Sequence, residues 1–102
     1  MRWRAKLPYI HDVLRDYPDL IEKQKETLTE SEVRRIDAVN RAIDKIRKLN
    51  LGDEKVQAIQ LLYFSKTYLP QGVARIMGVG KRTVERWNAE AMRILDKEMN
   101  LM

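Results

Sequence analysis

The sequence contains no cysteine, so neither a disulfide nor a thiolate metal site can form, and a reducing compartment fits the composition. No apolar run approaches the roughly 18 residues that a membrane-spanning helix needs. The basic N-terminal residues are not followed by the apolar segment of a signal peptide. We therefore expect a soluble, cytoplasmic protein without a membrane partner.

Residues for catalysis are also scarce. His11 is the only histidine, which excludes a histidine-pair metal site, and we expect a surface or half-buried side chain there. Residues 78–83 superficially resemble a phosphate loop, but Arg75 stands where the first glycine should be, and Arg82 separates the lysine from the threonine. We expect no enzyme, no metal site and no cofactor.

Breakers of helices are few. Three prolines and four glycines in 102 residues leave long stretches of good helix formers, and no segment has a pattern that predicts a β-strand. The net charge of +5 favours anionic partners only mildly. The sequence predicts an all-α fold: a small helical domain with a C-terminal helix-turn-helix, preceded by a long amphipathic helix.

Residues 1–28 are predicted to form short helices. The first begins near Pro8, because proline suits a first helical turn, and runs to about Tyr17. Pro18 is expected to interrupt it, and a second short helix should cover residues 19–26.

Residues 29–52 predict a long amphipathic helix. Thr29 and Glu32 have the spacing of a capping box, and Asn50 and Gly52 suit the left-handed conformation that ends helices. An apolar stripe recurs at spacings of three and four, at Val33, Ile36, Val39, Ile43, Ile46 and Leu49. This stripe packs either on the following helices or, as a short coiled-coil seam, in a homodimer.

Residues 53–102 are predicted to form a helix-turn-helix DNA-binding domain. Asp53 offers an N-cap to a helix that carries Val56, Ile59, Leu62 and Tyr63. In residues 70–89, Ala74 is small where a second helix crosses the first, and Gly78 supplies a positive φ four residues later. The inward positions are apolar, namely Val73, Met77, Val79, Val84 and Trp87. We expect Trp87 in the core rather than stacked on a base.

The outward positions of this segment predict contacts with double-stranded DNA. A recognition helix enters the major groove with its N-terminus first. Its arginines can bind guanine, its acids can accept from cytosine, and hydroxyl, amide and cationic side chains can contact phosphates. Gly80 leaves the first N–H groups of this helix open to a phosphate. The predicted DNA-binding residues are Gln71, Arg75, Lys81, Arg82, Thr83, Glu85 and Arg86. Later charges, Glu90, Arg93, Asp96, Lys97 and Glu98, are expected to form a solvated face.

Residues 56–97 resemble a known type of domain. The run Gly72-Val73-Ala74-Arg75-Ile76-Met77-Gly78-Val79, followed by Arg82-Thr83-Val84-Glu85-Arg86-Trp87, is similar to region 4 of sigma-70-type factors. Within that group, the chain resembles small phage regulators of the ArpU and RinA kind. The resemblance implies transcription regulation in a phage or prophage, with promoter DNA and RNA polymerase as partners.

Two alternatives stay open. Helix-turn-helix segments also occur in phage small terminase subunits, whose packaging role would bring a large oligomeric ring. The surface of the helix-turn-helix could instead bind a polypeptide, so that the protein would be a sigma region 4-like module acting on RNA polymerase.

Overall fold

The computed structural model describes residues 3–23, 25–65 and 69–100, and side chains from residue 10 onward except that of residue 25. It contains α1 (Trp3–Glu22), the 3-10 turn η1 (Lys25–Thr27), α2 (Glu30–Arg47), α3 (Gly52–Ile59), the π-helical turn η2 (Gln60–Phe64), α4 (Pro70–Met77) and α5 (Lys81–Asn100). No strand occurs in these ranges, which confirms the all-α prediction. Over the same part of the chain, no helix has the length and apolar character to cross a membrane.

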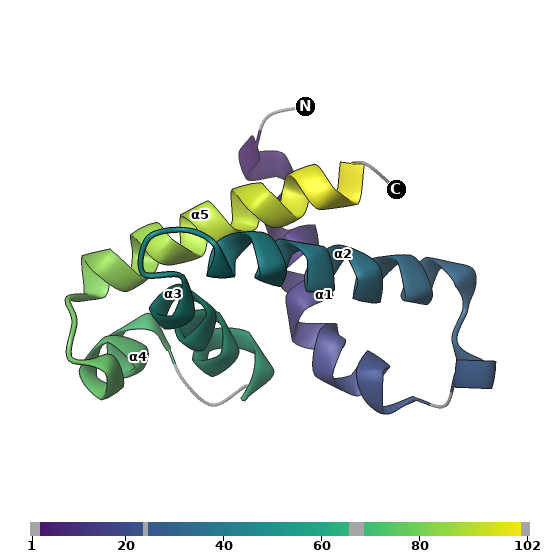
Figure 1. Cartoon of the computed structure of the whole chain (residues 1–102), viewed down its shortest axis with the longest axis horizontal. Helices are drawn as coiled ribbons and strands as arrows, with labels where there is room; N and C mark the ends of the chain where they lie inside the picture. The colour runs from purple at the N-terminus through teal and green to yellow at the C-terminus, as the bar shows by residue number, and fades with distance from the viewer. Residues whose placement is uncertain (1–2, 24, 66–68, 101–102) are drawn as a thin grey trace.

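The long C-terminal helix α5 organises the molecule. It contacts each of the other four α-helices. Figure 1 shows α3 and α4 on the side of its N-terminal half, with α1 and α2 near its C-terminal half. The α5 helix therefore takes part in two separate groups of buried side chains.

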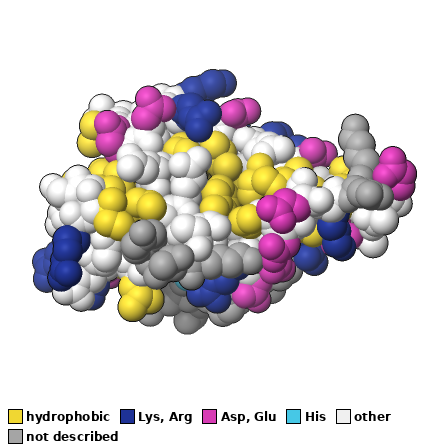
Figure 2. Space-filling model, turned by 90° about the horizontal axis from the view of Figure 1, so that it is seen from below, with side chains coloured by type: hydrophobic (Ala, Val, Ile, Leu, Met, Phe, Trp, Pro, Cys, Tyr) yellow, Lys and Arg dark blue, Asp and Glu magenta, His cyan; other side chains and the backbone are white. Residues whose placement is uncertain are grey.

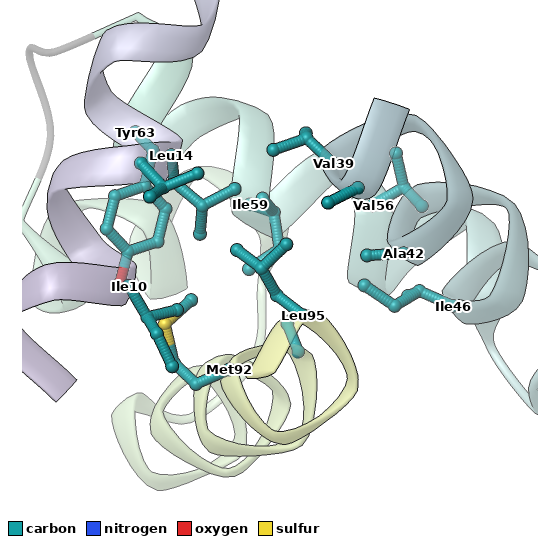
Figure 3. Packing of buried hydrophobic residues seen from close by; sticks show 13 residues of the cluster. Ile10, Leu14, Val39, Ala42, Ile46, Val56, Ile59, Tyr63, Met92 and Leu95 are labelled. Carbon is teal, nitrogen blue, oxygen red and sulfur yellow. The ribbon is translucent and has the colours of Figure 1, made fainter. Parts of the chain in front are cut away.

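The larger group is a core between α1, α2, α3, η2 and α5. Its side chains converge from all five elements, as Figure 3 shows. Its largest fully buried members include Ile10, Ile59, Met92 and Leu95. Fully burying an aliphatic side chain of this size contributes about 1.5–3 kcal/mol. This core holds the C-terminal half of α5 against the N-terminal half of the chain.

The predicted capping box at the start of α2 is confirmed. The Glu32 amide donates to Thr29 Oγ1 at 3.1 Å, and the Thr29 amide donates to Glu32 Oε1 at 3.0 Å. The hydrogen bond from Lys23 Nζ, at 2.8 Å, and that from the Thr29 amide lower the pKa of Glu32 to about 2. Glu32, in the first turn of α2, is thus bonded both to the N-cap residue Thr29 and to Lys23, the residue after α1.

The buried face of α2 differs from the predicted stripe. Its buried residues are Ala38, Val39, Ala42 and Ile46. The predicted Val33 and Leu49 stay 41% and 37% exposed. The small side chains of Ala38 and Ala42 let neighbouring helices approach closely. The face of α2 that contacts those helices is therefore centred on these alanines rather than on the predicted stripe. The α2 face therefore packs within the chain.

The prediction of two short N-terminal helices is wrong. A single helix, α1, begins at Trp3 and continues through Pro18 to Glu22, and only the turn η1 follows it. Proline inside a helix costs about 3 kcal/mol. Buried side chains on both sides of Pro18, Val13 and Leu14 before it and Leu20 after it, offset that cost.

The turn between α2 and α3 also differs from its prediction. The residue with positive φ is Leu51, at φ 56°, rather than Asn50 or Gly52. Gly52 is the first residue of α3, and a Cβ there would lie 2.1 Å from the Arg47 carbonyl oxygen. Glycine is thus required for close approach of two backbones. Asp53 lies in the first turn of α3 and is not its N-cap, because Leu51 occupies that position.

Glu98 is the largest departure from the predicted surface. Only 1% of its side chain is exposed, and it forms ion pairs with two cations of α2, Arg41 Nε at 3.0 Å and Lys45 Nζ. Hydrogen bonds from Lys45 and Arg41 lower its pKa despite the opposing effect of burial. Glu98 therefore links the end of α5 to α2 as a carboxylate.

Replacing Gly52 by alanine should destabilise the fold by about 3 kcal/mol, because the new methyl group meets backbone that cannot swing aside. Urea unfolding followed by circular dichroism measures this loss. Gly80→Ala is the matched control, since its Cβ would find no atom closer than Thr83 Oγ1 at 3.9 Å. Equal stability of the two variants would contradict the close approach.

Replacing Glu98 by glutamine should lower the free energy of unfolding at pH 7 by about 2 kcal/mol. Because the folded-state pKa of Glu98 is lowered, its contribution is complete above the unfolded pKa of about 4.3 and disappears as the pH falls through the folded value. The gap between wild type and variant, measured by urea unfolding, should therefore close on acidification. The exposed Glu85→Gln should show no such gap, and a gap independent of pH would refute the assignment.

Candidate nucleic-acid interface

The α4 helix and the turn after it form as the sequence predicts. Pro70 is the first residue of α4. At the other end, Gly78 adopts φ 69°, its amide donates to Arg75 O at 3.4 Å, and the Val79 amide donates to Ala74 O at 3.0 Å. These two bonds are those of a Schellman motif. The turn is therefore fixed by local hydrogen bonds around a left-handed glycine.

The α5 helix begins directly after this turn. The Gly80 carbonyl accepts from the amides of Thr83 and Val84, at 3.1 and 3.2 Å. Gly80 has no side chain in front of the first turn of α5. The predicted role of these N–H groups in holding a phosphate stays a prediction.

A second buried cluster locks α4 and α5 together. It consists of Ala58, Val73, Ala74, Val84 and Trp87, with Leu61, Leu62, Met77 and Val79 packed at its edge. Val84 is fully buried and Trp87 is 9% exposed. The sequence-based placement of Ala74 beneath the crossing and of Trp87 in the core is confirmed.

The predicted DNA-binding residues lie outside this cluster. Six of the seven are exposed, and Thr83 is half-buried, with its Oγ1 accepting from Arg86 Nη2 at 3.3 Å. The exposed six are Gln71, Arg75, Lys81, Arg82, Glu85 and Arg86. None of them takes part in an ion pair shown among the described residues. In Figure 2, Lys and Arg side chains gather at the left end of the molecule, where Figure 1 places the α4–α5 turn.

The outward face of α5 carries a row of arginines. At 3.6 residues per turn, Arg82, Arg86, Ala89 and Arg93 fall within one narrow stripe. This stripe lies opposite the buried one, which includes Val84, Ala91 and Leu95. Burial of one side of α5 therefore directs three arginine side chains away from the buried stripe.

Sequence reasoning missed the middle of this face. A cleft of about 450 Å³ lies between the α2–α3 turn and α5, with Arg86, Glu90 and Arg93 on one side and Asn50 and Lys55 on the other. Lys55 Nζ lies 2.7 Å from Glu90 Oε1. Arg93 and Glu90 were expected on a mixed solvated face. The helical spacing of Arg82, Arg86 and Arg93 is the sequence signal that could have indicated the α5 side of the cleft. The other side of the cleft comes from residues about 40 positions earlier in the chain, which no local pattern connects to α5.

The sole histidine lies away from this face. His11 is half-buried and meets the ring of Tyr63 edge-on, with centroids 5.5 Å apart. Burial, and then the charge of Arg15, lower its pKa, so it is neutral at pH 7. Among the residues with described positions, no three histidine or acidic side chains are grouped to hold a metal ion.

Replacing Trp87 by alanine should cost about 3–5 kcal/mol of stability, because it removes the largest side chain of the second cluster. Chemical denaturation measures the loss. Ile76→Ala on α4 is the control, since Ile76 is half exposed and should lose less than about 1 kcal/mol. A similar loss in both variants would argue against a buried Trp87.

Comparison of the chain with protein-family models, with curated proteins and with solved structures found no match. The similarity to region 4 of sigma-70-type factors therefore depends on the residues of this sequence alone.

Proposed function

We propose that this protein binds double-stranded DNA by inserting the N-terminal half of α5 into the major groove. One observation carries the proposal: Val84 and Trp87 anchor α5 by one side, while Arg82 and Arg86 extend from the opposite side. Lys81 is exposed at the first residue of the helix, and none of these three cations has an acidic partner among the described residues. An α-helix fits the major groove, which is about 12 Å wide.

The side chains divide into two kinds of contact. Arg82 and Arg86, one helical turn apart, can bind guanine edges in a bidentate manner, and Glu85 can accept from cytosine N4. Phosphates can be contacted by Lys81 and Thr83 and, from α4, by Gln71 and Arg75. The proposal gives base recognition to α5 and positioning on the backbone mainly to α4 and the turn.

The biological setting that we propose comes from the sequence resemblance. It is transcription regulation in a phage or prophage, with RNA polymerase as a second partner. A monomer with one recognition helix binds DNA weakly, so we expect either a homodimer or assistance from polymerase.

A protein-docking role is the second candidate, and exposed apolar side chains favour it. Leu69 and Ile76, before and within α4, are 77% and 50% exposed. Apolar surface of this kind suits contact with another polypeptide. Failure of the protein to bind any duplex at low salt would favour this candidate over the first.

Replacing either Arg82 or Arg86 by alanine should weaken DNA binding. An arginine that reads a base should cost about 1–3 kcal/mol and relax preference at one base pair, whereas one that contacts a phosphate should weaken all sequences alike. Titration of labelled duplexes at several salt concentrations separates the two outcomes. Arg34→Ala is the control, because it removes the same charge from the far end of α2, where Arg34 pairs with Glu30. Wild-type affinity and salt dependence in the double Arg82/Arg86 variant would refute the groove assignment.

The target site can be found by selecting bound sequences from random duplexes, with the solution mass of the protein measured in parallel. A palindromic site together with a dimeric mass would indicate a twofold dimer. A large ring would instead support the packaging alternative.

A further inference from the structure

One wall of the cleft between the α2–α3 turn and α5 is the turn itself, whose backbone is sterically constrained at two adjacent residues. Leu51 adopts a left-handed conformation that costs about 1–2 kcal/mol for a residue with a Cβ. Gly52 beside it touches the end of α2 so closely that no side chain fits. In Figure 1 this turn arches over the middle of α5, and Asn50 and Leu51 line the cleft. The residue types at positions 51 and 52 are therefore tied to the path that this wall follows.

The charge of the cleft is positive. Lys55, Arg86 and Arg93 line it against a single carboxylate, that of Glu90. Glu90 is paired with Lys55 at 2.7 Å, so it neutralises the lysine rather than the arginines. Arg93 Nε donates to Ala89 O at 3.4 Å, which holds the guanidinium along the helix. The two arginines remain available to an anion.

Distance along α5 indicates which anion. Arg93 lies seven residues after Arg86, and at 1.5 Å per residue this is roughly 10 Å along the axis. With the start of α5 in a groove about 8.5 Å deep, a side chain that far back has left the base edges and reached the bordering sugar–phosphate strand.

We infer that this cleft receives a backbone phosphate of the bound duplex, with Arg93 as its principal contact and Asn50 beside it on the α2–α3 turn. The inference depends on the proposed function and extends the DNA-contacting surface from α4 and the start of α5 to the α2–α3 turn. Glu90 limits the strength of this contact, because it holds Lys55 out of it.

Two substitutions test the cleft from opposite directions in the full-length chain. Arg93→Gln should weaken binding of a labelled mixed-sequence duplex by about tenfold and lower the slope of log affinity against log salt by about one. Glu90→Gln releases Lys55 and should strengthen binding and raise the slope by about one. Arg34→Gln, with the same charge change as Arg93→Gln but far from the cleft, should bind like wild type.

The outcomes separate the cleft from the groove. If wild type binds the duplex and Arg82→Gln weakens it, while Arg93→Gln and Arg34→Gln give equal affinities, the cleft assignment is overturned and the groove assignment stands. If the wild-type protein binds no duplex, both the cleft assignment and the groove assignment are refuted. Inorganic phosphate, followed by the NMR signal of the Arg93 Nε–H group, is a further arm. If phosphate shifts that signal and the protein does not bind duplex, the cleft is a site for free anions. That result would overturn the proposal that a DNA phosphate occupies it.

Discussion

The rotation of α5 about its own axis determines which of its side chains reach solvent, and burial along one side of the helix determines that rotation. Val84 and Trp87 pack into the cluster with α4, and Met92 and Leu95 pack into the core with the first three helices. Turning the helix by a single residue position would expose these side chains and push arginines into the core. Burying an unpaired cation costs several kcal/mol, so this alternative is strongly disfavoured. The cationic face is thus a consequence of packing at two separated points.

The helix-turn-helix segment could be predicted because its determinants are local. All of them lie within 20 residues: the helix crossing at Ala74, the left-handed Gly78 and the apolar positions that follow. At each of these positions, local sterics favour the residue type that is present. The capping box is local in the same sense, since Thr29 and Glu32 satisfy one another's backbone groups. Agreement of several independent local signals makes such a prediction robust.

Features decided by distant contacts could not be predicted in this way. Pro18 is a helix breaker by local rules, yet α1 continues because its buried side chains lie against other helices. The sequence predicts positive φ at Gly52, whereas the fold requires its lack of a side chain, and Leu51 takes the left-handed conformation instead. Both properties of glycine give the same sequence signal near the end of a helix. Only the path of the backbone distinguishes them.

The surface charge of α5 shows the same dependence on distant contacts, and it explains how a mildly basic chain presents a distinctly basic face. Residues 81–100 carry five cations and four acids, nearly balanced in the sequence. In the fold, Glu98 turns inward to Arg41 and Lys45 of α2, and Glu90 pairs with Lys55 of α3. Two acids of α5 are therefore neutralised by cations of other helices. Arg82, Arg86 and Arg93 of α5 have no ion pair with an acid among the described residues. A local excess of positive charge therefore arises from the arrangement of ion pairs rather than from composition.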